Sequence, residues 1–400
     1  MFIKQLNYIT EFFLWVLVFG ITLGNAPTEV ASYWIIFLFL VKKIILKDIK
    51  FPGSLMDVLF CIFFVIVFVS FLRSNNFNDS LRGFSRVPKY LFLYLALTDF
   101  FAGDKKRITR FFWVIMAVST VTFLNGIFQS IFGFDIFKHN VMNKSEHLLR
   151  INSAFVHPND FAAYIVTVLP LALLFFKKEL SSKKRIILAA IFLIGLYCLM
   201  RTSSRGAWVG FIFAMIFFFS VYRRKMLIFI PIVAIVVILL APSGIYRVKD
   251  LLKPSEGSAG ERMVLWQGTW TMIKSHPVLG SGINTFMKNF EKYYPTSCQQ
   301  GFYVHNSYLQ MWSEIGIVGL IVFLAIPLTV IIRAFTNIKT KIRSSPEGVI
   351  LLSSICGYIS FLVHAAVDNN LFSLVLTTLF WVFSAYIVSF NNYLKEKINA

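Results

Sequence analysis

The chain has 400 residues, of which 57 % are hydrophobic and only 14 % are charged, and its mean hydropathy is +0.72. Despite a formal net charge of +20, this composition excludes a soluble nucleic-acid-binding protein and predicts an all-α, polytopic integral membrane protein. Most of the positive charge orients helices in the membrane, because short loops rich in Lys and Arg stay on the cytoplasmic side.

Twelve apolar runs are suited to crossing a bilayer, since about 20 helical residues span roughly 30 Å of hydrocarbon. They divide the chain into nine spans in residues 1–241, one large folded periplasmic loop in residues 242–311 and three spans in residues 312–400. The predicted spans are residues 6–24, 30–46, 55–72, 87–101, 111–132, 160–176, 185–201, 206–221, 226–241, 312–333, 348–366 and 371–390.

The basic residues predict which loops are cytoplasmic. More than half of the 39 Lys and Arg residues lie near the two termini and in alternate loops, for example Lys42 after the second run and Lys105 after the fourth. Both termini are therefore expected inside, and residues 242–311 outside. The remaining basic residues face outward, against the usual bias. They indicate an anionic ligand on the outer side, with lipid headgroups as the alternative partners.

The outer segment before the sixth span begins at Arg150 and carries a histidine next to a predicted helix start. Pro158 is typical of the first helical turn, and Asn159 or Asp160 is positioned to cap the helix. His157 has two interpretations that the sequence leaves open. It contacts the substrate, or it forms a structural hydrogen bond.

The turn Arg201-Thr202-Ser203-Ser204-Arg205 joins the seventh and eighth spans on the outer side with almost no loop. Both arginines are therefore fixed at the membrane edge, where an arginine is costly unless it is hydrated or paired. The planar guanidinium donors suit phosphate oxygens. The alternative is that each arginine snorkels from a helix end toward water.

The outer loop, residues 242–311, is too long for a connector and too apolar for a disordered tail, so we expect it to fold. Residues 261–273 predict an amphipathic helix that begins at Arg262 and lies on the membrane surface. The turn that follows contains Gly280 and Gly282, which allow the backbone to approach a ligand closely. The predicted apolar face of the helix consists of Met263, Trp266, Trp270 and Ile273.

The segment that leads into the tenth span opens with His305 and Asn306, which places a titratable ring at a boundary between water and lipid. Because the ordinary pKa of histidine is about 6.5, His305 is a candidate acid–base group. Glu314 lies nine residues later, on another side of a regular helix, so it is expected to pack against other spans without pairing to His305. The outer loops show no acidic pair or metal-ligand spacing, and we expect neither a metal nor a cofactor.

Four short motifs resemble the O-antigen ligase and polymerase family of bacterial envelope enzymes. The resemblance covers residues from about 150 to 325 by motif and the whole chain by topology. It implies a twelve-span helical protein that transfers a glycan from an undecaprenyl pyrophosphate carrier to an acceptor on the periplasmic side. The motifs are Ser-Arg-Gly-Ala-Trp at 204–208, Gly-Glu-Arg at 260–262, Pro-Val-Leu-Gly-Ser-Gly at 277–282 and His-Asn at 305–306.

The resemblance also implies roles for residues of this sequence. His305 resembles the essential histidine of the family, and Arg205 and Arg262 resemble its pyrophosphate-binding arginines. Since the carrier pyrophosphate is already a good leaving group, the chemistry needs cations to neutralise it and a base for the acceptor hydroxyl. Further candidates for substrate contact are Arg201, Arg150, His157 and Asn306.

We therefore predict a metal-independent O-antigen ligase in the bacterial inner membrane, with its active site on the periplasmic face. Its expected partners are an undecaprenyl-pyrophosphate-linked glycan, a lipid A core acceptor and membrane lipids, and no nucleic acid. A polymerase that uses a second carrier-linked glycan as acceptor is the main alternative. A flippase for lipid-linked glycans is a further one, but it would need more charges deep in its spans and no large folded outer loop.

Overall fold

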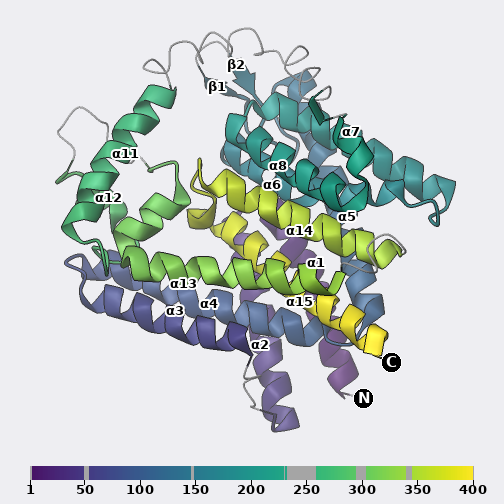
Figure 1. Cartoon of the computed structure of the whole chain (residues 1–400), viewed down its shortest axis with the longest axis horizontal. Helices are drawn as coiled ribbons and strands as arrows, with labels where there is room; N and C mark the ends of the chain where they lie inside the picture. The colour runs from purple at the N-terminus through teal and green to yellow at the C-terminus, as the bar shows by residue number, and fades with distance from the viewer. Residues whose placement is uncertain are drawn as a thin grey trace.

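The structure is a computed structural model, which describes residues 2–48, 54–145, 148–228, 230–231, 258–293, 303–338 and 345–399. Long α-helices make up nearly all of this part of the chain, and most of them run side by side (Figure 1). A two-stranded antiparallel hairpin, β1 (Asn143–Ser145) and β2 (Leu148–Arg150), is the sheet within these ranges. The all-α, polytopic class predicted from composition is confirmed.

The described residues form thirteen α-helices. They are α1 (Phe2–Leu23), α2 (Asn25–Leu46), α3 (Leu55–Leu72), α4 (Phe77–Phe101), α5 (Lys105–Phe132), α6 (Pro158–Val168), α7 (Ser182–Thr202), α8 (Arg205–Tyr222), α11 (Ser258–Ser275), α12 (Phe286–Phe290), α13 (Ser307–Ile338), α14 (Pro346–Ala365) and α15 (Leu374–Asn399). Three 3-10 helices complete the described elements: η1 (Leu169–Phe176), η2 (Arg224–Ile228) and η3 (Asn370–Phe372).

In the described ranges, nine helices are long and apolar enough to cross a membrane. The helices α2 and α4, which contain two of the twelve predicted spans, are not among them. Charged side chains such as Glu29 in α2 and Asp99 in α4 explain this, because they interrupt the apolar windows. Most of the predicted span 226–241 falls outside the described residues.

The most deeply buried helices are α14 and α15, which lie at the centre of the bundle. Tyr358 of α14 donates or accepts a 2.7 Å hydrogen bond with Ser384 of α15 and stacks on Phe380. Gly357 lets α14 approach the backbone of α6, since a Cβ there would lie 1.9 Å from the carbonyl oxygen of Thr167. The loop that connects these two central helices lies at one end of the bundle.

The opposite end of the bundle carries paired charges. Lys42 and Lys43 both reach Asp99, at 2.6 and 3.1 Å, and Lys105 lies 2.6 Å from Glu347. We call this the basic end. Its lysines come from loops that the sequence predicts to be cytoplasmic, and both chain termini lie on the same right-hand side in Figure 1, away from α11 and α12. The grouping agrees with the predicted topology, while the side of the membrane that it faces stays a prediction.

The helix α13 is broken at Gly316, whose φ of 73° and ψ of 176° are not helical. At such a break, backbone N–H and C=O groups lose their helical hydrogen bonds, and in a membrane protein they need other hydrogen-bond partners. The turn at 277–282 supplies them: the carbonyl of Pro277 accepts from Ile317, and the amide of Gly282 donates to the carbonyl of Glu314. The break is therefore a docking point for the outer loop on the bundle.

This docking corrects the prediction for the two glycines of that turn. A Cβ at Gly280 would lie 2.3 Å from the backbone of Glu314, and one at Gly282 would lie 2.5 Å from Ser74. Both glycines therefore let the turn pack closely, Gly280 against α13 and Gly282 against Ser74, which follows α3. The buried carboxylate of Glu314 accepts from the backbone amides of Asn284 and Phe286, so it contacts the segment after the turn and not, as predicted, another span. It forms no pair with His305, in agreement with the prediction.

Candidate functional site

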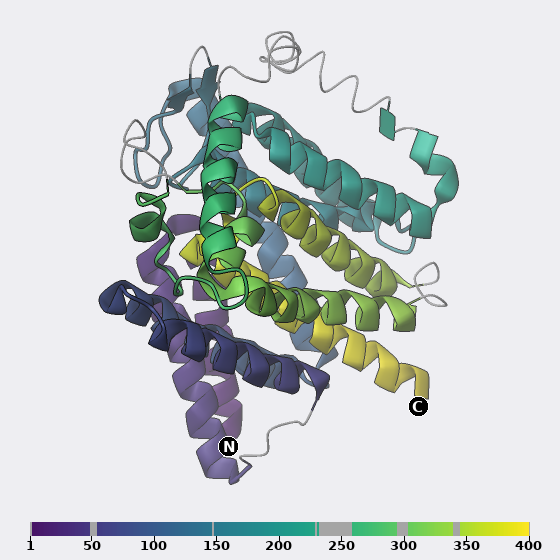
Figure 2. The same ribbon diagram turned by 60° about the vertical axis from the view of Figure 1, so that its left-hand side comes forward.

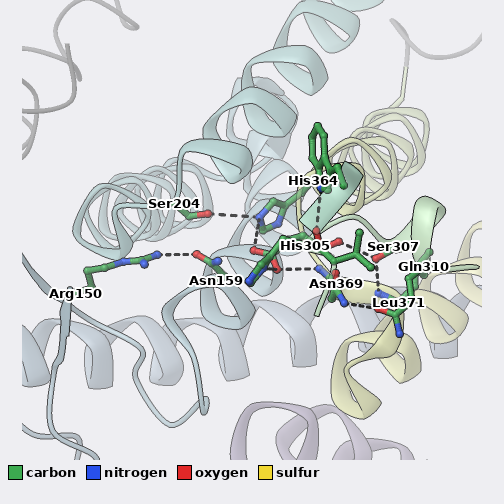
Figure 3. Close-up of polar contacts among 12 residues, drawn as sticks. Arg150, Asn159, Ser204, His305, Ser307, Gln310, His364, Asn369 and Leu371 are labelled. Atoms are coloured by element: carbon green, nitrogen blue, oxygen red, sulfur yellow. Dashed lines mark hydrogen bonds and ion pairs between the residues drawn. The ribbon is translucent and has the colours of Figure 1, made fainter. Parts of the chain in front are cut away.

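Five segments distant in sequence meet at the end of the bundle opposite the basic end. They are the hairpin strand β2 with the segment that follows it, the α7–α8 turn, the helix α11, and the start of α13 with the facing α14–α15 loop. Figures 1 and 2 show α11 standing across the direction of α13 at this end. The polar contacts that connect the segments are drawn in Figure 3.

The centre of the site is a pair formed by His305 and Asp368. Nδ1 of His305 lies 3.4 Å from Oδ1 of Asp368, and the imidazole remains about one-third exposed. His305 has a φ of 51°, a left-handed conformation that non-glycine residues adopt rarely and that often marks functional sites. The ring therefore has one nitrogen facing a carboxylate while its other nitrogen can serve a substrate.

Two flanking contacts hold His305 in this conformation. On one side, the indole N–H of Trp266 in α11 donates a 2.9 Å hydrogen bond to the carbonyl of Val304. On the other side, both the backbone N–H and the hydroxyl of Ser307 donate to the carbonyl of Asp368, at 3.1 and 2.8 Å. The backbone around the histidine is thus clamped between α11 and the α14–α15 loop.

Asp368 connects His305 to a second histidine. Its Oδ2 lies 3.9 Å from Nε2 of the buried His364, which also lies 3.4 Å from the hydroxyl of Ser204 (Figure 3). Burial would raise the pKa of Asp368, but the hydrogen bond from His305, both histidine charges and the amide of Asn369 lower it to about 2. Asp368 is therefore an anion at neutral pH.

Arg150, Arg205 and Arg262 lie within electrostatic reach of one another and of this carboxylate. Burial lowers the pKa of Arg150, Asp368 opposes this effect, and the charges of Arg262 and Arg205 add to it. The pKa of Arg262 is lowered by burial and by Arg205, again against Asp368. The structure thus brings the two arginines predicted to bind pyrophosphate, Arg205 and Arg262, near Arg150, which was predicted as a further substrate contact.

Arg150 is the best fixed of these arginines. Its Nε donates to the carbonyl of Thr202 at 2.7 Å, and its Nη2 donates to the side chain of Asn159 at 2.6 Å. These bonds use two of the five N–H groups of a guanidinium. They also correct the prediction for Asn159: the N-cap position of α6 belongs to His157, which forms no side-chain cap, and Asn159 holds the arginine instead.

Gly206 explains part of the Ser-Arg-Gly-Ala-Trp motif. A Cβ at this position would lie 2.4 Å from Val367 and 3.1 Å from the ring of His364. Only a residue without a side chain lets the first turn of α8 approach the α14–α15 loop this closely. This contact holds the start of α8 against the loop that carries Asp368.

The other predicted contact residues are placed less centrally. Nε of Arg201 donates to Ser130 of α5 at 3.1 Å. His157 is exposed, and Asn306 uses its side-chain oxygen to cap α13 by accepting from the amides of Tyr308 and Leu309. Their roles toward a substrate stay predictions.

The sequence reasoning missed Asp368 and His364. Both belong to the segment His-Ala-Ala-Val-Asp at 364–368, in which His364 lies in the last turn of α14 and Asp368 in the short connection to α15. An acidic residue in an outer connector this short was the available signal, since a charge there needs a partner. Within the described ranges, no three His, Cys, Asp or Glu side chains are placed to hold a metal ion together.

The helix predicted in the outer loop is present, with different details. It begins at Ser258, so Arg262 lies in its second turn. Its buried side includes Leu265 and Met272, which pack with Val304 and α12 in a small core of their own, while Met263 and Trp270 are exposed. The predicted apolar face was therefore shifted, because the tertiary partner of the helix was invisible in the sequence.

Comparison with known proteins relates part of this chain to a described protein family. Residues 189–324 match the model of a family described as O-antigen ligase. A Rickettsia felis protein named "Putative polysaccharide ligase" is 29 % identical over 202 residues, covering 46 % of this chain and 48 % of its own.

A Rickettsia conorii protein with the same description is 26 % identical over 296 residues, or 68 % of this chain and 66 % of its own. A Haemophilus influenzae protein without a functional name is 24 % identical over 359 residues, or 83 % and 85 % of the two chains. The matched segment contains Arg205, Arg262 and His305. The resemblance seen in the motifs is thus confirmed: residues 189–324 of this helical membrane protein match the O-antigen ligase family model.

Proposed function

We propose that this protein transfers a glycan from undecaprenyl pyrophosphate to the core oligosaccharide of lipid A. The family match supports a reaction of the ligase or polymerase type. The observation that carries the proposal is the arrangement of His305 on Asp368 beside Arg150, Arg205 and Arg262. A base and a cluster of cations are what displacement of a pyrophosphate by a hydroxyl requires.

The proposed reaction is a single displacement. The acceptor hydroxyl attacks the anomeric carbon of the donor glycan, a new glycosidic bond forms, and the bond from that carbon to the pyrophosphate oxygen breaks. The hydroxyl proton passes to Nε2 of His305. The carrier leaves as undecaprenyl pyrophosphate, and the bonding electrons stay on its oxygen.

Asp368 prepares the histidine for this role. When Nδ1–H of His305 donates to Asp368, the Nε2 lone pair is available as the base. The carboxylate then stabilises the imidazolium that forms, as an orienting acid does in catalytic triads. His364 and Asn369 hold the carboxylate from its other sides.

The arginines stabilise the charge that develops on the leaving group. Guanidinium groups donate to phosphate oxygens in pairs, and partial burial strengthens these interactions. Arg150 and Arg262 are partly buried, whereas Arg205 is exposed. A pyrophosphate at this place would accept hydrogen bonds from these guanidinium groups and lie against their positive charge.

The test is reconstitution of the purified protein in vesicles with a carrier-linked glycan. Lipid A core and a second carrier-linked glycan are offered separately as acceptors. We expect the glycan on lipid A core. Product only with the second acceptor would assign a polymerase, and no product with either acceptor would contradict the proposed chemistry.

We further propose that the site faces the periplasm of the inner membrane. Single cysteines at Met263 on α11 and at Glu396 near the end of α15 are placed in a chain whose four natural cysteines are replaced by serine. A membrane-impermeant thiol reagent added to intact spheroplasts should modify only Met263→Cys. Modification of Glu396→Cys alone would invert the topology.

A further inference from the structure

A cavity of about 380 Å³ lies between α3, α4, α13 and α15, next to the site but outside its arginine cluster. Its deep wall is buried and mostly apolar, with Phe60 and Trp381 only 3 % and 5 % exposed, and it also includes the buried carboxyl of Glu314. Val87, Leu91 and Phe323 continue this lining. The volume is near the lower limit of small-molecule pockets, about 300–1,000 Å³, and suits one lipid chain.

The solvent-facing part of the lining is charged. Arg86 of α4 is exposed there, and Lys288 of α12 forms a 2.6 Å ion pair with Asp79. Tyr303, two residues before His305, lies at the same part and is 45 % exposed. A mostly apolar interior below Arg86 and the ion pair of Lys288 with Asp79 fits an amphiphile with an anionic group close to its chain.

One wall separates this cavity from the site. Gln310 lines the cavity, and its side-chain oxygen accepts a 2.5 Å hydrogen bond from Asn369, the neighbour of Asp368. Leu371 also lines the cavity, and its amide donates to Ser307 at 3.3 Å (Figure 3). The first turns of α13 therefore line the cavity and also contact the loop that carries Asp368.

We propose that this cavity binds one acyl chain of the acceptor lipid, with a lipid phosphate at Arg86 and Lys288, an assignment that rests on the proposed function. The donor chain is attached directly to the pyrophosphate, so it belongs with Arg150, Arg205 and Arg262. A second lipid needs a separate place from which its sugar can reach His305. The cavity provides one, because its exposed end at Tyr303 adjoins that histidine.

Photolabelling tests the binding directly. The probe is lipid A with a diazirine in one acyl chain, added to the full-length protein in nanodiscs. We expect label on cavity-lining peptides of α4 and α15, with competition by unlabelled lipid A and little by phosphatidylglycerol or undecaprenyl phosphate. Equal competition by phosphatidylglycerol would make this a bulk-lipid site. Competition by undecaprenyl phosphate would make it a donor site, and absence of label would leave it without this ligand; each result overturns the proposal.

Matched variants sharpen the assignment. Val87→Trp fills the cavity, whereas Val65→Trp places the same side chain on an exposed position of α3. Only the first should lose the label and raise the KM for lipid A core, by at least about tenfold, because a filled apolar pocket loses most of its chain contacts. The donor KM should change in neither variant. A parallel rise in donor KM for Val87→Trp would contradict the separation of the two lipids.

The charge contribution has its own pair. Arg86→Gln should weaken labelling, while Arg82→Gln, one helical turn earlier and outside the lining, should not. Equal labelling of both variants would remove the phosphate from the proposal. Labelling of the wild type without glycan transfer would contradict the proposed function and leave the lipid site standing. Transfer without labelling would contradict the lipid site alone.

Discussion

The two ends of the helix bundle use basic residues in different ways. At the basic end, lysines lie against carboxylates of neighbouring helices, as Lys105 does with Glu347 and Lys42 with Asp99. At the site end, Arg150 and Arg262 lie within electrostatic reach of Arg205 and of Asp368, which faces His305. Asp160 also interacts electrostatically with Asp368. In the first arrangement each lysine lies directly against a carboxylate, whereas the second brings several arginines together.

This difference separates structure from function in one molecule. A paired surface charge contributes little, because its Coulomb energy is offset by desolvation and side-chain ordering. Partly buried arginines placed near each other cost free energy, as the lowered pKa of Arg150 and Arg262 shows. Such a cost is typical of sites where a ligand supplies the missing charge.

The largest effect is expected at the base. His305→Ala should lower the transfer rate by about 10²–10⁴-fold, the usual loss of a general base, while carrier binding stays near normal. Transfer rate and carrier-lipid binding are measured on the same preparation. His157→Ala is the control, because its side chain is exposed and should cost much less. A greater loss with His157→Ala would reassign the base.

The arginines should be the next most sensitive. Arg205→Lys and Arg262→Lys keep the charge and lose the planar fork, so each should lower the rate by about 10²-fold, as loss of one transition-state donor does. Lys105→Arg at the basic end is the reverse exchange and should leave the rate unchanged. If both site variants retain normal turnover, these arginines only snorkel toward water.

Asp368→Asn should lower the rate by about 10–100-fold, the usual cost of losing the partner that orients a histidine. The amide keeps the shape and removes the anion that favours the Nε2 base. Because the pKa of Asp368 is lowered to about 2, its carboxylate is charged at neutral pH. Its contribution to the free energy of unfolding is fully present above the ordinary pKa of aspartate and is lost as the pH falls toward 2.

Separate measurement of kcat and of the donor KM checks this assignment. Asp368→Asn should lower kcat and leave the donor KM near normal, because Asp368 acts on the donor through His305 alone. A raised donor KM with an unchanged kcat would contradict the positioning role and place Asp368 in substrate binding.

Much of this comparison was visible in the sequence. The apolar runs predicted the helical class, and the loops that contain Lys and Arg predicted that Lys42 and Lys105 lie at one end and His305 at the other. Each of these features depends on short stretches of sequence, so it can be predicted without knowledge of tertiary contacts. The same reasoning missed Asp368, because its partners come from α13 and α14 and only the tertiary fold brings them together.

The two glycines of the 277–282 turn are a second case in which the sequence did not reveal the tertiary contact. Gly280 and Gly282 were expected at a ligand, since close approach is all that a sequence can indicate. What they approach is the broken backbone of α13 and the side chain of Ser74. The break at Gly316 was not predictable from an apolar run that continues through it.

The smallest effect is expected at the basic end. Glu347→Gln removes the partner of Lys105, whose side chain is 50 % exposed, so the free energy of unfolding should fall by less than about 1 kcal/mol and the transfer rate should not change. Thermal unfolding in detergent and the transfer assay measure the two quantities. A large loss of rate from this distant carboxylate would mean that the two ends are coupled, and the division between a balanced end and a ligand-binding end would then fail.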